Sequence, residues 1–363
     1  MKLGTYFPQN GIYKLSDGTF CAVEGHDVLG CRNEVFLVNS LVALFQVVRA
    51  GATAINFLPL LLKLPNAALL TIAFTLLTLV KSAVMESGID LQAVLYITGP
   101  QGVGKTSLAR RIAGFVTRLD DPQNRPALFF DAGSTLSAIR DAMADNRDLP
   151  IIIDDLCLSA SPVAQRKRLD LAAQIVRESA NAAEIVKKKP GGKLIHLRCE
   201  AGVLLTAEFA LDNASDLTRC IIAHVRESLN LPEELNSSFI SQLAYAFLSY
   251  FLDNAEALLK ELHSNIRNNT INALEDCDQE RVRTNLLTLR WAFEIMLRAI
   301  AQQDGLNNQY DRLRARFDDS LHESVATQNE LLQKIRANIP EGNIAYILLC
   351  GYRNKDFNLL NYN

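Results

Sequence analysis

The stretch LYITGPQGVGKTSLARRIAGF, from Leu95 to Phe115, decides what kind of fold this chain adopts. It begins with apolar, β-prone residues, continues through a glycine-rich turn, and ends with helical spacing. Its segment 99–106 matches the pattern G-x-x-x-x-G-K-[ST], whose glycines let successive backbone N–H groups turn inward around a phosphate. The helix that follows adds the positive end of its dipole. A strand leading in and a helix leading out are the context that such a phosphate-binding loop requires.

We expect this loop to hold the phosphates of ATP. Lys105 would reach the β- and γ-phosphates, and the Thr106 hydroxyl would bind Mg²⁺. A loop of this pattern without any ligand is the alternative interpretation. The residues expected to contact the nucleotide are Gly99, Pro100, Gln101, Gly102, Val103, Gly104, Lys105, Thr106 and Ser107.

Strand-like and helix-like segments alternate around this loop, which predicts a parallel sheet with crossover helices. The strands should be apolar on both faces, because helices cover both sides of such a sheet. We expect five strands, at 93–98, 127–131, 150–154, 202–206 and 220–225. We expect helices at 105–118, 134–145 and 162–186.

The regions flanking this core have different patterns. Residues 11–24 predict a β-hairpin with a turn at 16–18, and residues 35–85 predict two or three packed helices. After Pro232 the apolar residues recur at helical spacing to about residue 336, which predicts a helical bundle. The expected domains are therefore a hairpin and helical region at 1–88, the core at 89–231, the bundle at 232–340 and a tail at 341–363.

One apolar run raises the question of a membrane. Leu64 to Val80 holds 17 uncharged residues, which is at the lower limit for crossing a bilayer core of roughly 30 Å. Pro65, Asn66 and three threonines weaken that interpretation, and Lys81 closes the run. We favour a helix buried against the core and expect no membrane contact.

The composition of the chain indicates its cellular compartment and the kinds of partner it can bind. The formal net charge is -3, so any contact with nucleic acid must be local. The seven cysteines are odd in number and scattered, with no CxxC pair, which favours neither a disulfide framework nor a zinc site. We expect a reducing, cytoplasmic location.

A second motif follows the loop in the chain. The apolar segment 150–153 ends in Asp154 and Asp155. Asp154 is expected to hold the Mg²⁺ shell, and Asp155 to activate the attacking water. Aspartate is one methylene shorter than the glutamate that many ATPases carry there, so the water must sit nearer or hydrolysis is slow. An Asp-Asp turn after a buried strand is the alternative.

Two further polar residues are candidates for hydrolysis. Thr206 ends an apolar segment and is followed by Glu208. If this segment pairs with the Asp154 strand, Thr206 would orient the water; the alternative is a threonine placed by strand propensity. Arg219 precedes the last strand and would reach the γ-phosphate of a neighbouring subunit, unless it is an ordinary surface arginine. Further candidates, for sensing nucleotide within the subunit, are Arg267, Arg281, Arg283 and Arg290.

A basic segment follows the third expected helix. Lys187, Lys188, Lys189 and Lys193 surround a Pro-Gly-Gly turn and predict a projecting loop or hairpin tip. Such a tip would grip DNA phosphates by charge alone. A solvated surface loop is the alternative, and the cluster at 165–168 is expected to be a solvated helix face.

Together these motifs resemble an AAA+-type ATPase, and more narrowly the ATPase domain of uncharacterised primase–helicase-like proteins of phages, plasmids and integrative elements. The resemblance covers roughly residues 60–305 and rests on GPQGVGKT, LPIIIDD, ESANAAEIVKKK, LLTAE and the arginine before CIIAHV. It implies an α/β P-loop NTPase of AAA+ type, in which Thr206 is the sensor and Arg219 the arginine finger. Two departures are Gln101-Gly102-Val103, where serines are common, and Asp155, where glutamate is common.

Three functions are compatible with these motifs. The first is an oligomeric, ring-forming, Mg²⁺-dependent ATPase that moves along DNA or remodels a DNA-bound complex. The second is a nucleotide-dependent regulatory switch that acts on a protein partner encoded in the same mobile-element or defence operon. The third is a small-molecule kinase, which the absence of an arginine-rich lid segment disfavours.

Overall fold

The computed structural model describes part of the chain. The described residues are 5–7, 11–14, 20–24, 27–29, 35–37, 45–46, 57–118, 126–131, 133–181, 184–188, 194–268, 277, 279–304 and 308–337.

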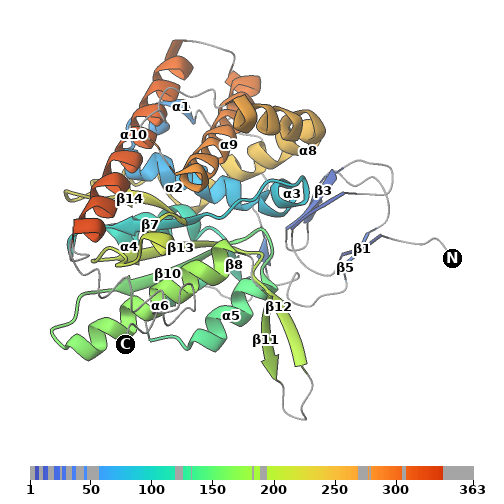
Figure 1. Ribbon diagram of the computed structural model, residues 1–363. Coiled ribbons are helices and arrows are strands. Elements are labelled where there is room, and N and C mark those ends of the chain that lie inside the picture. The colour runs from blue at the N-terminus through green and yellow to red at the C-terminus, as the bar shows by residue number, and fades with distance from the viewer. Residues whose placement is uncertain are drawn as a thin grey trace, which may run out of the picture.

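A five-stranded parallel sheet forms the centre of the fold (Figure 1), as the sequence predicts. Its order is β14-β7-β13-β10-β9, so the strands are not in chain order. Every residue of β7 and β13 is buried, which explains why these segments are apolar on both faces. The strands are β7 (Val94–Thr98), β9 (Phe129–Asp131), β10 (Pro150–Leu156), β13 (Gly202–Ala207) and β14 (Cys220–His224).

The position of β13 matters most for the site. It lies between β7 and β10, with Thr206 paired to Ile97 on one side and Leu205 paired to Ile153 on the other. Parallel strands end at the same edge of a sheet. The ends of β7, β10 and β13 therefore bring the phosphate-loop start, the two aspartates and Thr206 to one edge.

The crossover helices cover the two faces of the sheet. They are α4 (Lys105–Ala113), α5 (Leu136–Asp145), α6 (Pro162–Ala180) and the short α7 (Ala214–Leu217). Because such crossovers are right-handed, α4 lies on one face, and α5 and α6 lie on the other. The Ser161 side chain caps α6, and Pro162 occupies its first turn, where a missing N–H costs nothing.

The apolar run before the phosphate loop is a helix buried on all sides, as the sequence predicts. It follows α1 (Leu58–Leu61), forms α2 (Asn66–Thr78) and precedes α3 (Lys81–Glu86). The hydroxyls of Thr71 and Thr78 donate to the carbonyls of Ala67 and Phe74 one turn earlier. Those bonds satisfy the Thr71 and Thr78 hydroxyls inside the core, whereas the buried Thr75 hydroxyl has no hydrogen-bond partner among the described residues. Among the described residues, no helix has the length and apolar character to cross a membrane.

Three long helices complete the fold: α8 (Ser237–Asn268), α9 (Glu280–Asp304) and α10 (Asn308–Ala337). They form the predicted helical bundle, and α9 and α10 pack on α2 and β14 (Figure 1). Phe293 of α9 stacks on Phe317 of α10 with ring centroids 3.8 Å apart. The backbone N–H of Ile222 donates to the Ser324 hydroxyl of α10 over 3.2 Å. Helix α10 therefore covers the edge strand β14 and satisfies its unpaired backbone.

Smaller strands surround this core. A three-stranded antiparallel sheet of β2 (Gly11–Lys14), β3 (Phe20–Glu24) and β4 (Asp27–Leu29) contains the predicted hairpin, whose turn lies outside the described residues. The other pairs are β1 (Thr5–Phe7) with β5 (Val35–Leu37), β6 (Phe45–Gln46) with β8 (Thr117–Arg118), and β11 (Glu184–Lys188) with β12 (Leu194–Arg198).

Three helix predictions are wrong in their extent. The helix expected at 162–186 ends at Ala180, and residues 184–188 form strand β11, because Ile185 and Val186 favour a ladder with β12. The helix expected at 105–118 ends at Ala113, since Gly114 follows and 117–118 pair with β6. Within 35–85 the described helices begin at Leu58, and 35–37 and 45–46 are strands.

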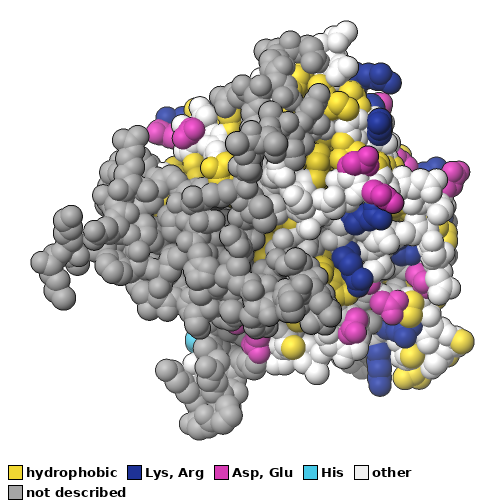
Figure 2. Space-filling view, turned by 180° about the vertical axis from the view of Figure 1, so that it is seen from behind, with side chains coloured by type: hydrophobic (Ala, Val, Ile, Leu, Met, Phe, Trp, Pro, Cys, Tyr) yellow, Lys and Arg dark blue, Asp and Glu magenta, His cyan; other side chains and the backbone are white. Residues whose placement is uncertain are grey.

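Charge is distributed without a dominant sign on the surface that can be described. On the face shown in Figure 2, described Lys and Arg side chains are interspersed with Asp and Glu. This agrees with the small net charge of -3. Any strongly charged contact must come from a local group of residues.

The contact between β13 and α2 gives a test of the packing. A Cβ added at Gly202 would lie 2.3 Å from the Thr78 hydroxyl oxygen and methyl carbon. Gly202→Ala should therefore lower the free energy of unfolding by about 1–3 kcal/mol, the usual cost of overpacking. Urea unfolding measures this change. Adding Thr78→Ala, which removes both close atoms, should recover part of the loss; an equal cost in both backgrounds would contradict the contact.

Candidate functional site

The phosphate loop is shaped by two glycines. Gly104, at the N-cap of α4, has φ +98°, a left-handed conformation that side chains rarely adopt. A Cβ on Gly99 would lie 2.1 Å from the carbonyl oxygen of Val225, so only glycine fits against the segment after β14. That segment also closes over the loop, with the Leu229 N–H donating to the Val103 carbonyl over 3.0 Å. Sequence patterns gave no indication of this cover.

Lys105 is folded back onto its own loop. Its Nζ donates to the carbonyls of Gly99 and Pro100 at 2.8 and 2.6 Å. Burial lowers the pKa of the Lys105 ammonium, and the carboxylates of Glu208, Asp154 and Asp155 oppose that shift. The carbonyls therefore hold a cation that phosphate oxygens would bind more strongly.

The Asp154 carboxylate joins three parts of the fold. Its Oδ1 accepts hydrogen bonds from the hydroxyl of Thr106 on α4, at 2.9 Å, and from the hydroxyl of Thr206 on β13. The Thr206 oxygen in turn accepts from the Asp155 N–H over 3.2 Å. Thr206 therefore lies beside the Asp154 strand. Its proton is directed to Asp154, and the side chain is 2% exposed.

Thr106 and Asp154 fit a magnesium ion. Their oxygens are hard donors 2.9 Å apart at the mouth of the phosphate loop. Magnesium in nucleotide sites is commonly held by one or two protein oxygens, with phosphates and waters completing its shell. Among the described residues no group of three or more His, Cys, Asp or Glu side chains could hold a metal. A magnesium ion here would thus depend on these two residues and on the nucleotide.

A cavity of about 290 Å³ gathers these groups. It lies where α4 begins and where β10 and β13 end. Its lining residues are Gln101, Gly102, Gly104, Lys105, Thr106, Ser107, Asp155, Leu156, Cys157, Thr206, Ala207 and Glu208. The cavity therefore joins the glycine-rich loop to the two other motifs that the sequence singles out.

Asp155 has an unusual backbone. Its φ is +63°, and the pairing of β10 with β13 shifts register between Ile153 and Leu156. Aspartate is one of the few residues other than glycine that enter this region readily. The side chain of Asp155 is exposed at the rim of the cavity.

The loop after Asp155 is held by residues of α6 and by Glu208, which follows β13. The Arg168 guanidinium donates to the Cys157 carbonyl over 2.9 Å, and the Gln165 amide accepts from the Ser159 N–H over 2.9 Å. Glu208 accepts from the Leu158 N–H over 2.9 Å. The expectation of a solvated face at 165–168 is therefore wrong for Gln165 and Arg168, since the sequence does not show that this loop folds back over α6.

Arg219 lies far from its own phosphate loop. It immediately precedes β14, and its carbonyl accepts from the Val94 N–H at the start of β7. The phosphate loop leaves the other end of β7 after Thr98. At about 3.3 Å per strand residue the two features are separated by about 20 Å along the sheet.

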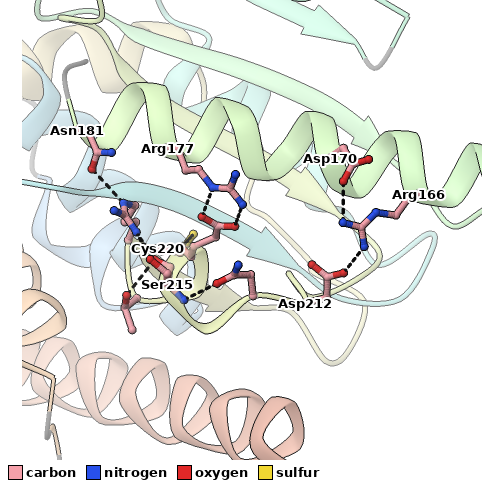
Figure 3. A network of polar contacts seen from close by, with 11 residues as sticks. Arg166, Asp170, Arg177, Asn181, Asp212, Ser215 and Cys220 are labelled. Atoms are coloured by element: carbon pink, nitrogen blue, oxygen red, sulfur yellow. Dashed lines mark hydrogen bonds and ion pairs between the residues drawn. The ribbon is translucent and has the colours of Figure 1, made fainter. Parts of the chain in front are cut away.

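The Arg219 guanidinium is held by neutral oxygens. Its Nε donates to the Asn181 side chain over 3.0 Å, and its Nη1 donates to the Ser215 hydroxyl over 2.7 Å. Figure 3 labels both partners, Asn181 and Ser215. The nearby Asp216 is 1% exposed and engaged by Arg177 in two bonds of 2.6 Å. Among the described residues Arg219 has no carboxylate partner. Burial and the charge of Arg281 lower the pKa of Arg219, and the charge of the Asp216 carboxylate opposes that shift.

The other candidate arginines make contacts away from the phosphate loop. Arg290 pairs with Asp318 of α10 at 2.7 Å, and Arg283 donates to the Cys277 carbonyl. Arg281 donates to the Thr218 hydroxyl over 3.2 Å, on the Arg219 side of the sheet. Arg267 lies in the last turn of α8.

Two of the four candidate lysines lie in a β-hairpin. Lys187 and Lys188 belong to β11, which pairs antiparallel with β12 and projects away from the sheet (Figure 1). Lys189 and Lys193 lie outside the described residues. The exposed side chains of this hairpin include Val186, Leu194 and His196.

Comparison with known proteins is informative at the level of fold. No protein-family profile and no curated protein matches the sequence. A solved structure described as SCCmec type IV Cch, an active helicase, has a TM-score of 0.58 and 16% identity, over 93% of this chain and 65% of that chain. A JCV helicase structure aligns over 74% of this chain and 60% of that chain, at 12% identity and a TM-score of 0.26. The chain thus spans about 65% of the length of Cch, and its fold, built on a five-stranded parallel sheet, is similar to that of Cch.

Proposed function

We propose that this protein is a Mg²⁺-dependent ATPase that works as an oligomer and couples ATP hydrolysis to movement on DNA or to remodelling of a DNA-bound complex. The observation that carries the proposal is the hydrogen bond between Thr106 and Asp154 beside Lys105. A hydroxyl, a carboxylate and a buried cation at one glycine-rich loop suit a magnesium-bound triphosphate. In this proposal Asp154 and Thr106 hold the ion, and Thr206 fixes Asp154.

The position of Arg219 supports the proposal of an oligomer. Its backbone is about 20 Å from its own phosphate loop along the sheet, by strand length. Its guanidinium is nevertheless held at the surface by neutral oxygens without a carboxylate partner among the described residues. Such a cation suits an anion brought by another molecule. We propose that Arg219 contacts the γ-phosphate bound by a neighbouring copy of the chain, where it would stabilise transition-state charge.

The hairpin β11–β12 is the proposed DNA contact. Its lysines lie on a projecting element that follows α6, and α6 begins just after the Asp155 loop. Movement of that loop during hydrolysis would therefore reach the hairpin through one helix. The description of Cch as an active helicase supports this proposal without fixing the substrate of this chain.

A nucleotide-dependent switch with a protein partner is the second candidate. The exposed, shorter carboxylate of Asp155 favours it, because a poorly placed base suits slow hydrolysis. Slow turnover that is unaffected by DNA, together with a nucleotide-dependent change in protein binding, would identify a switch.

The first prediction concerns nucleotide binding. Lys105→Ala should weaken ATP binding by about 10- to 100-fold, because charge-assisted hydrogen bonds contribute about 1.5–3 kcal/mol. Isothermal titration with Mg²⁺ and a slowly hydrolysed ATP analogue measures this loss. The matched control is Lys63→Ala, an exposed lysine, which should bind as the unmodified protein does. Equal affinities for the two variants would contradict a phosphate role for Lys105.

The second prediction tests whether Arg219 acts on another subunit. Arg219→Ala should lower ATP turnover by about 10³-fold while nucleotide binding is kept. Mixing it with the inactive Lys105→Ala protein should restore turnover, because the Lys105→Ala subunit supplies an intact Arg219 to its neighbour. A steady-state ATPase assay over a range of mixing ratios measures the recovery. Mixtures as inactive as their components would exclude action between subunits.

The third prediction concerns DNA. Lys187→Ala combined with Lys188→Ala should remove the stimulation of turnover by single-stranded DNA. It should also reduce the slope of log affinity against log salt by about 1.4, since each phosphate contact on a single strand contributes about 0.7. Fluorescence anisotropy at several salt concentrations measures the slope. Lys260→Ala, on the surface of α8, is the control and should change neither the stimulation nor the slope. An unchanged slope for the hairpin variant would show that the hairpin does not contact DNA.

A further inference from the structure

Glu208 lies between the two loops that form the nucleotide cavity. It follows the last residue of β13, the strand between β7 and β10. Its backbone N–H donates to the Leu156 carbonyl over 3.0 Å, and the preceding Ala207 carbonyl accepts from the Gly99 N–H. These bonds fix the Glu208 backbone beside the start of the phosphate loop and the end of the Asp155 strand.

Glu208 lines the cavity together with Thr206, whose hydroxyl contacts Asp154. The Oε2 of Glu208 accepts from the Leu158 N–H over 2.9 Å. No hydrogen bond to its Oε1 occurs within the described part of the chain. One oxygen therefore anchors the carboxylate while the other stays available in a cavity shared with Lys105 and Thr106.

Glu208 shares the cavity with the residues proposed to bind the phosphates. Lys105, Thr106 and Glu208 all line it. Lys105 is the residue proposed to hold the β- and γ-phosphates. A carboxylate in the same cavity is suited to meet a water at the γ-phosphate.

Asp155 is less suited to that task. Its backbone is left-handed, its side chain is exposed, and it is one methylene shorter than glutamate. A general base must reach the proton of the attacking water within hydrogen-bond distance. The longer, anchored and partly buried side chain of Glu208 meets this requirement better.

We propose that Glu208 is the general base for ATP hydrolysis, which deepens the proposed function and rests on it. The water oxygen bonds to the γ-phosphorus, and the bond from that phosphorus to the β–γ bridging oxygen breaks, with its electrons staying on ADP. The water proton passes to Oε1 of Glu208 and then to solvent or product phosphate.

Two variants that remove charge without changing size test this assignment. Glu208→Gln keeps an acceptor for the Leu158 N–H but cannot take a proton, so turnover should fall by about 100-fold or more. Asp155→Asn should be at least about tenfold more active than Glu208→Gln. The second measurement is the nucleotide extracted from the protein after incubation with Mg²⁺ and ATP. Glu208→Gln should hold unhydrolysed ATP where the unmodified protein holds ADP.

The outcomes separate this proposal from the proposed function. Near-normal turnover of Glu208→Gln would show that Glu208 only anchors Leu158. If Asp155→Asn retained ATP and Glu208→Gln did not, Asp155 would be the base and the ATPase proposal would stand. If the unmodified protein neither bound nor hydrolysed ATP, the proposed function itself would fail.

Discussion

One oxygen atom, Oδ1 of Asp154, connects the glycine-rich loop, strand β10 and strand β13. It accepts hydroxyl hydrogen bonds from the first turn of α4 and from the end of β13 while its own residue ends the apolar run of β10. A partly buried carboxylate needs such donors, because an unpaired buried charge is costly. Meeting that need fixes the relative positions of the glycine-rich loop, β10 and β13.

The packing around this edge is set by a second constraint, the complete burial of α2. A helix apolar on all sides must be enclosed, and α4, α9, α10 and the sheet enclose it. Helices α9 and α10, which lie more than 150 residues later in the chain, thus pack on α2, which precedes the phosphate loop. The described residues share one continuous hydrophobic core as a result. Helix α10 also covers β14, so the sheet has no bare edge on that side.

Sequence predicted the elements whose patterns are local. The glycine-rich loop, the five apolar strands and the buried run at 64–80 follow from spacing and composition, and the structure contains each of them. The end of α6 was not predicted, because the residues that form β11 are helix-compatible until they pair with β12. The contacts of Glu208 with Leu158 and of Arg168 with Cys157 depend on a loop folding back in space. The periodicity of a single sequence does not show where a loop folds back in space. The position of Arg219 at the end of the sheet opposite its own phosphate loop could be assigned only once the order of the strands was known.

That placement has a consequence for how copies of the chain would assemble. The phosphate loop and Arg219 lie at opposite ends of parallel strands, so the proposed contact joins two different surfaces and is heterologous. Such contacts have a direction, and a row of them has two unlike ends. In an open arc the last phosphate loop has no arginine from a neighbour, and at the other end one Arg219 has no phosphate to meet. Closure into a ring is then the arrangement in which every bound nucleotide meets a complete set of catalytic groups.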